Sequence, residues 1–129
     1  MAGTVDIFFD NLGSSLSLHQ GGKLRILGVC GPERSPSLPD IPTAREAGVH
    51  DFTSTTWFVL MAPKNTSPEI LAKINAAVSD ILREPDIRAK FAALGVESAP
   101  MSLQGTAAFI ESERAKWGGI IRFAQIAIE

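Results

Sequence analysis

The feature that most constrains this sequence is a proline-rich segment, residues 33–48, which lies between two apolar runs. Its prolines fix φ and remove backbone donors, so we expect an extended segment that stays outside any sheet. A short helical turn is predicted from Thr43 to Ala47, with Gly48 taking the left-handed conformation that ends it. The segment therefore predicts an ordered connector. The prolines are Pro36, Pro39 and Pro42.

The residues before the connector have the pattern of a strand, a helix and a second strand. Strands are predicted over residues 3–11 and 23–29, and a short helix over residues 12–20, closed by two glycines. This order predicts a βαβ unit with parallel pairing and a right-handed crossover. Ligands of open α/β sheets bind beyond the carboxyl ends of the strands, which is where Asp10 and Asn11 lie.

The second half of the chain is predicted to be mostly helical. Apolar side chains recur every three or four residues in three segments, each preceded by a capping residue or a proline. The predicted helices run from Pro68 to about Arg83, from Pro85 to a stop at Gly95, and from Leu103 to Ile126. Extended structure is predicted for residues 52–62 and 96–99. The glycine pair at 118–119 is expected to weaken the last helix by about 1 kcal/mol per glycine.

Four motifs in order give this chain a specific resemblance. They are G-x-V-D-x-x-F-D-N from Gly3, G-K-L-R-x-L-x-V from Gly22, R-S-P-x-L-P-D-I-P-T-x-x-E-A-G from Arg34, and T-x-W-F-x-L-x-A-P-x-x-T from Thr55. Between Gly3 and about Ile126 the sequence resembles the C-terminal portion of the tripartite tricarboxylate transporter substrate-binding proteins. These are the TctC or Bug family of extracytoplasmic solute receptors.

The resemblance implies a fold, a domain division and a set of partners. The fold class is α/β, a partial type II periplasmic-binding-protein fold with a βαβ parallel sheet unit followed by C-terminal helices. Residues 1–58 would form part of the second, ligand-cleft domain, and residues 59–129 the hinge return and the C-terminal helices of the first domain. The chain has less than half the family's usual length, so it resembles a fragment of a receptor. Its partners would be a small carboxylate ligand and the membrane subunits of a transporter.

The expected binding residues are Asp10, Asn11, Leu12, Trp57 and Phe58. A carboxylate receptor needs neutral donors, which Asn11 and the amides of residues 12–14 at a helix N-terminus would provide. Asp10 would repel a carboxylate, but it could accept a hydrogen bond from an ammonium group or from water, or it could instead cap the helix. Trp57 and Phe58 would line the cleft or pack in the core.

Several other functions are disfavoured by the sequence. A formal net charge of −2 gives no electrostatic basis for binding nucleic acid, and no helix-turn-helix segment supports a LysR-type regulator. Cys30, Ser14, His19 and Asp10 do not have the spacing of a catalytic nucleophile, so we expect no enzyme, no catalytic residue and no cofactor. His19 and His50 are too far apart to predict a metal site. Residues 21–23 favour a turn over a phosphate loop.

The family resemblance and the N-terminal sequence imply different locations for this protein. The family is exported, which implies a periplasmic protein, whereas the N-terminus has no signal-peptide pattern, so the chain as written would be cytoplasmic. Two functions from different classes stay open. The first is a solute receptor for organic carboxylates or acidic amino acids, and the second is a truncated remnant that self-associates without a transport role. In either case we expect a homodimer, with the last helix at its interface.

Overall fold

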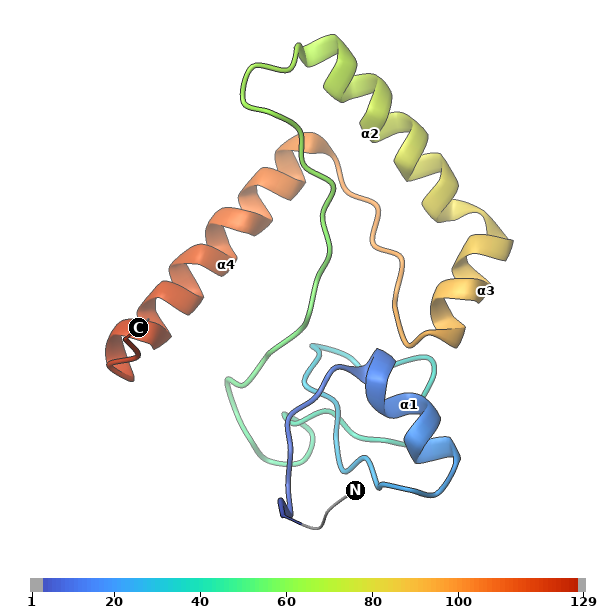
Figure 1. Cartoon of the computed structure of the whole chain (residues 1–129), viewed down its shortest axis with the longest axis vertical. Helices are drawn as coiled ribbons and strands as arrows, with labels where there is room; N and C mark the ends of the chain where they lie inside the picture. Colours follow the sequence, from blue (N-terminus) through green and yellow to red (C-terminus); the bar gives the residue numbers. More distant parts are fainter. Residues whose placement is uncertain (1–3, 128–129) are drawn as a thin grey trace. The chain divides into compact units, whose positions relative to one another are not determined.

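Figure 1 shows the computed structural model of the chain, which describes residues 4–127. The chain divides into two compact units. Unit 1 comprises Met1–Met61 and Glu84–Ser98, and unit 2 comprises Ala62–Arg83 and Ala99–Glu129. The described residues contain four helices: α1 (Leu12–Gln20) and α3 (Pro85–Ala93) in unit 1, and α2 (Pro68–Arg83) and α4 (Leu103–Phe123) in unit 2.

The predicted helices are confirmed, with the capping that the sequence indicates. Ser67 Oγ accepts a hydrogen bond from Ile70 N–H at 3.4 Å at the start of α2, and Ser102 Oγ accepts one from Gly105 N–H at 3.0 Å at the start of α4. Helix α4 continues through the glycine pair but ends at Phe123, before the predicted Ile126. Gln125 has a φ of 52°, a left-handed conformation that a helix cannot continue through.

The predicted βαβ sheet unit is not confirmed, because residues 4–127 form no strand. Val29 and Thr43 make one isolated parallel bridge, in which Val29 N–H donates to Pro42 O at 2.9 Å and Ala44 N–H donates to Val29 O at 2.8 Å. A strand needs a neighbour for its backbone groups. Segments 4–9 and 58–61 are not assigned to any strand, and most of their apolar side chains are exposed.

The proline-rich connector is folded by turns, so the prediction of an extended backbone is wrong. Leu38 N–H donates to Ser35 O at 2.9 Å, and Ile41 N–H donates to Leu38 O at 3.1 Å. Pro36 and Pro39 therefore occupy the second position of two successive turns, where a fixed φ near −65° is favourable. The predicted helical turn is present, with hydrogen bonds from Ala47 N–H to Thr43 O at 3.0 Å and from Gly48 N–H to Arg45 O at 3.1 Å, and Gly48 has a φ of 95°.

Three polar side chains close the connector on itself. The Glu46 carboxylate accepts from Arg34 Nε, at 3.1 and 2.9 Å to its two oxygens, and from Thr43 N–H at 2.7 Å. Thr43 Oγ1 accepts in return from Glu46 N–H at 3.1 Å, which completes a capping box. The Thr43 amide, followed by the Arg34 side chain, lowers the pKa of Glu46. Thr43 is itself buried, so this cluster holds the connector in one conformation.

In unit 2, α2 and α4 are in contact near the start of α4, where Asn75 Nδ2 donates to Met101 O at 2.9 Å. Glu113 is buried and accepts from Trp117 Nε1 at 2.9 Å and from Lys116 Nζ at 2.8 Å, so its charge is compensated. Large apolar side chains on both helices are exposed. They include Ile70, Ile74 and Ile81 on α2 and Leu103, Trp117, Ile120, Ile121 and Phe123 on α4.

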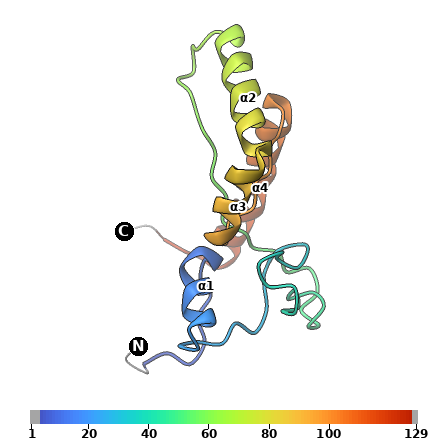
Figure 2. The same cartoon turned by 90° about the vertical axis from the view of Figure 1, so that its right-hand side faces the viewer.

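Figure 2 gives a second view of the same helices, and α4 is the longest of them. No helix among residues 4–127 combines the length and the apolar character required to cross a bilayer.

Residues 84–98 belong to unit 1 although they follow α2 in sequence. The assignment of residues 1–58 and 59–129 to two domains of the family fold stays a prediction.

Candidate functional site

The candidate site lies in unit 1 at the N-terminus of α1, and its first member is Asp10. The Asp10 carboxylate accepts hydrogen bonds from Ser15 Oγ at 2.6 Å and from Ser14 Oγ at 2.8 Å. The Ser15 hydroxyl, then the Ser14 hydroxyl and the Asn11 amide, lower the pKa of Asp10. Asp10 therefore stays ionised through neutral pH. Asn11 rather than Asp10 is the N-cap residue of α1, and the Asn11 side chain makes no capping hydrogen bond.

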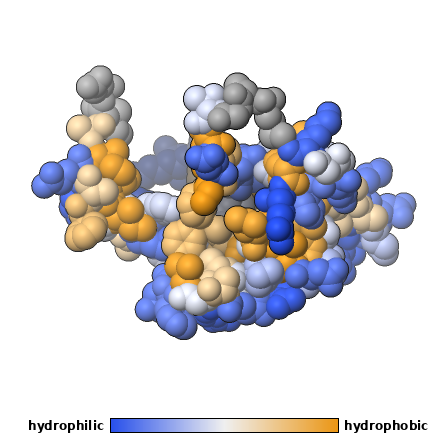
Figure 3. Space-filling view, turned by 90° about the horizontal axis from the view of Figure 1, so that it is seen from below, coloured by the Kyte–Doolittle hydropathy of each residue, from blue (hydrophilic) through white to orange (hydrophobic). Residues whose placement is uncertain are grey.

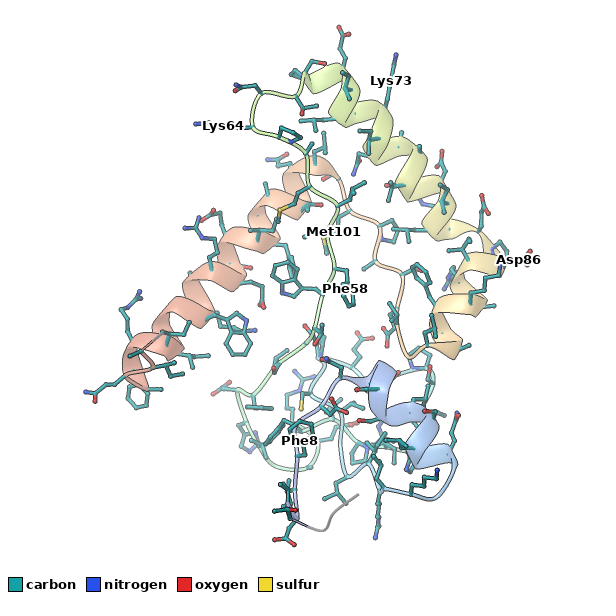
Figure 4. The ribbon with its side chains drawn as sticks, viewed as in Figure 1. Phe8, Phe58, Lys64, Lys73, Asp86 and Met101 are labelled. Atoms are coloured by element: carbon teal, nitrogen blue, oxygen red, sulfur yellow. The ribbon has the colours of Figure 1, made fainter. Side chains whose placement is uncertain are left out.

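The Asn11 side chain joins α1 to the segment that contains the predicted aromatic residues. Asn11 Oδ1 accepts a hydrogen bond from Thr56 Oγ1, and Trp57 and Phe58 follow directly in sequence. Trp57 is 36% exposed and Phe58 is 82% exposed. Figure 4 labels Phe8 and Phe58, two of the exposed rings of unit 1. Phe58 is therefore not a core residue in this structure, whereas core packing was one of its two predicted roles.

The backbone of the first turn supplies the donors that a carboxylate requires. The N–H groups of Ser14 and Ser15 donate to Asn11 O at 3.1 and 3.2 Å, so these two amides are used within the helix. The preceding amides, of Leu12 and Gly13, are the first-turn donors that have no intrahelical partner. The amides of residues 12–14 were all predicted to be available to a carboxylate. Only those of Leu12 and Gly13 have no partner within α1, because the Ser14 amide donates to Asn11 O.

A close backbone approach borders this turn. A Cβ atom on Gly13 would lie 2.8 Å from Leu94 O, and one on Gly95 would lie 3.1 Å from Gly13 N. The turn that follows α3 therefore packs directly on the start of α1. The sequence indicates Gly95 as a helix stop but gives no sign of this contact, because the two glycines are far apart in the chain.

His19 and Cys30 are the side chains that the sequence analysis considered for metal binding or nucleophilic chemistry. His19 Nδ1 accepts from Ile26 N–H at 3.4 Å, and burial raises the pKa of the Cys30 thiol. Within residues 4–127, no three His, Cys, Asp or Glu side chains lie close enough to hold a metal ion. Thr56 was missed by sequence reasoning, although a hydroxyl beside two aromatic residues was a usable signal.

Comparison with known proteins establishes the family. The family model described as "Tripartite tricarboxylate transporter family receptor" matches residues 1–126. The chain belongs to this family of solute-binding receptors.

Curated relatives support the assignment. BugT of Bordetella pertussis is 31% identical over 122 residues, which cover 95% of this chain and 37% of BugT. A protein from the clcB-clcD intergenic region of Pseudomonas knackmussii is 31% identical over 122 residues, which cover 94% of this chain and 72% of that protein. The chain thus spans little more than a third of the length of BugT.

Solved structures give the same fold. Rpa4515 of R. palustris, determined with adipate, has a TM-score of 0.80 and 34% identity, and the match covers 92% of this chain and 40% of that protein. MatC from Rhodopseudomonas palustris, with bound malate, has a TM-score of 0.70 and 33% identity over 85% of this chain and 38% of that protein. The chain therefore has the backbone arrangement of part of a periplasmic binding protein.

Proposed function

We propose that this chain is part of an extracytoplasmic receptor that binds a small organic carboxylate or an acidic amino acid for a membrane transporter. Neutral donors at the α1 N-terminus support this proposal most directly. The amides of Leu12 and Gly13 and the positive end of the helix dipole favour a carboxylate group. The related receptors with adipate and malate are consistent with that ligand class.

Asp10 adds selectivity to this arrangement. Its negative charge opposes a second carboxylate close by, so it favours a ligand that offers a donor at that position. The donor is a hydroxyl group, an ammonium group or a water molecule that the ligand holds. Trp57 and Phe58 would form the apolar wall beside the ligand's carbon chain. We propose no catalytic role for any of these residues, and a periplasmic location by family membership.

The test compares residues 1–129 alone with a chimera in which residues 1–126 replace the matched segment of BugT. Isothermal titration with adipate, malate, citrate and aspartate would measure both. We expect residues 1–129 alone to bind with a dissociation constant weaker than about 10 μM, because a ligand on one cleft wall loses most of its buried contacts. The chimera should bind one of these acids more tightly. A chimera that folds and binds none of them contradicts the proposal.

Point variants of the chimera locate the site. Asn11→Ala and Asp10→Ala should weaken binding of the acid that the chimera takes, while thermal unfolding shows that the fold is kept. Asn65→Ala and Asp40→Ala are the matched controls, since they remove the same groups from exposed positions outside the site. Equal affinity in all four variants would remove Asp10 and Asn11 from the site.

A second candidate function is self-association without a transport role. The observation that favours it is the amount of exposed apolar surface. Figure 3 shows hydrophobic side chains open on one face, and Val5, Ile7, Phe8 and Phe9 are each at least 67% exposed. Such surface marks an interaction site or a liability to aggregate. A stable dimer that binds no carboxylate, both alone and in the chimera, would favour this function.

A further inference from the structure

One hydrogen bond in unit 1 joins the proposed carboxylate site to a residue that the proposed function leaves without a role. Thr56 Oγ1 donates to Asn11 Oδ1, and the two residues are 45 positions apart in the chain. Asn11 is the N-cap residue of α1, and Thr56 lies directly before Trp57 in a segment of irregular structure. The bond therefore connects Thr56 to a residue that we expect to receive the ligand.

Other hydrogen bonds hold the backbone on both sides of this contact. Asn11 O accepts from two amides in the first turn of α1, at 3.1 and 3.2 Å. On the other side, Ser54 N–H donates to Cys30 O at 2.8 Å, which anchors the segment just before Thr56. Since both backbones are held independently, the bond between the two side chains mainly sets how those side chains are oriented.

The bond gives the Asn11 amide an occupied end and an open end. Oδ1 accepts from Thr56, whereas Nδ2 makes no hydrogen bond to the residues of the described range 4–127, and the side chain is exposed. The Nδ2 group has two N–H donors and no charge. It is therefore a neutral donor of the kind that a carboxylate accepts, beside the backbone amides at the α1 N-terminus.

We propose that Thr56 is a positioning residue of the carboxylate site: its hydroxyl group holds Asn11 Oδ1, so that Nδ2 donates to a carboxylate oxygen of the ligand. The inference rests on the proposed function, which takes the α1 N-terminus as the binding site. Half a turn of the amide would set Oδ1 against the carboxylate, and two acceptors without a proton between them repel each other. The hydroxyl group of Thr56 opposes that rotation, because it donates to Oδ1.

The test measures acid binding to the chimera with residue 56 changed. Thr56→Val removes the hydroxyl group but keeps the branched shape, and it should weaken binding about fivefold, the effect of one neutral hydrogen bond. Thr56→Ser keeps the hydroxyl group, so its affinity should stay within about twofold of the parent. Thr55→Val is the matched control and should leave the affinity unchanged. Thr55 is also exposed, and its hydroxyl group makes no hydrogen bond within residues 4–127.

A double substitution separates positioning from direct contact with the ligand. In the Asn11→Ala chimera, Thr56→Val should weaken binding no further, because Thr56 acts only through Asn11. A hydroxyl group that touched the ligand itself would give the same loss in both backgrounds. Thermal unfolding of Thr56→Val should be nearly that of the parent, since the bond lies between exposed side chains and adds little to stability.

A second measurement uses residues 1–129 alone and needs no ligand. In a ¹⁵N-labelled sample, the side-chain NH₂ signals that disappear in Asn11→Ala belong to Asn11. These signals should shift in Thr56→Val and return in Thr56→Ser, whereas Thr55→Val should leave them in place. Unchanged signals in Thr56→Val would overturn the inference, even if the corresponding chimera variant failed to fold.

The outcomes distinguish this inference from the proposed function. A parent chimera that binds no acid contradicts the proposed function, and this inference with it. A parent chimera that binds an acid, with equal affinity in Thr56→Val, overturns the inference alone. A further loss of affinity on adding Thr56→Val to Asn11→Ala would do the same, as would a failure of Thr56→Ser to restore binding.

Discussion

The two units of this molecule satisfy their backbone polar groups in different ways. In unit 2, α2 and α4 close their own hydrogen bonds along most of their length, and serine caps complete their first turns. In unit 1, much of the backbone lies outside helices and is held by turns, by the Arg34–Glu46–Thr43 cluster, and by the hydrogen bond between Asn11 and Thr56. Unit 1 therefore depends on contacts between residues far apart in the chain.

The difference predicts where each unit is fragile. Among the described residues, the buried apolar side chains are Leu16 and Leu38, both in unit 1, so hydrophobic burial alone does not hold either unit. Unit 1 should be sensitive to changes at its close contacts. Unit 2 should tolerate local changes but depend on whatever covers its exposed helix faces.

The largest effect is expected at the close contact between α1 and the turn after α3. Gly95→Ala should destabilise the chain by about 2 to 4 kcal/mol, because the new Cβ meets backbone atoms of Leu12 and Gly13 at 3.1 Å in a left-handed conformation. Gly22→Ala is the control, since Gly22 has the same φ of 67° but open space around it, and it should cost about 1 kcal/mol. Urea unfolding measures both. Equal losses of unfolding free energy in Gly95→Ala and Gly22→Ala would mean that the close contact at Gly95 does not affect stability.

The next effect tests the exposed face of α4. If a second copy covers it, the chain is a dimer in light scattering, and each large side chain removed from water contributes about 1.5 to 3 kcal/mol. Ile121→Asp should then give a monomer or insoluble protein. Ala115→Asp, also exposed on α4 but off the apolar stripe, should leave the dimer intact. A monomeric parent chain at high micromolar concentration would show that α4 is not a dimer interface.

A smaller effect is expected at the helix caps of unit 2. Ser102→Ala should destabilise α4 by about 1 kcal/mol, since its hydroxyl group accepts from Gly105 N–H at 3.0 Å. Ser67→Ala should cost less, because the corresponding distance to Ile70 N–H is 3.4 Å. Thermal unfolding of the two variants under identical conditions gives the ranking. The reverse order would show that cap distance does not set the stability of these helices.

The smallest effect concerns the pH dependence of unit 1. The pKa of Glu46 is lowered in the folded chain, so its ionised form is favoured there. The stabilisation is complete above the ordinary glutamate pKa and is lost as the pH falls through the lowered value. Glu46→Gln should flatten the curve of stability against pH at acidic pH. An unchanged curve in Glu46→Gln would contradict this role.

Part of the candidate site was predictable from sequence. Asp10, Asn11 and Leu12 were predicted beside the start of a helix, and the structure places them there. Thr56, the partner of Asn11, was not predicted, because it lies 45 residues away in a segment without periodicity. Likewise, Asp10 could have capped the helix, but it accepts from two serine hydroxyl groups instead. Both outcomes depend on three-dimensional placement.

The sequence by itself determined the helices and the family. Helix α1 and the starts of α2, α3 and α4 follow from caps, prolines and apolar spacing within each segment, since a helix bonds to itself. Tertiary structure decided the rest. Residues 23–29 have the composition of a strand, but within this segment only Val29 makes a β-bridge, with Thr43. A strand exists only where another segment lies beside it, and neither residue composition nor periodicity determines where that segment lies.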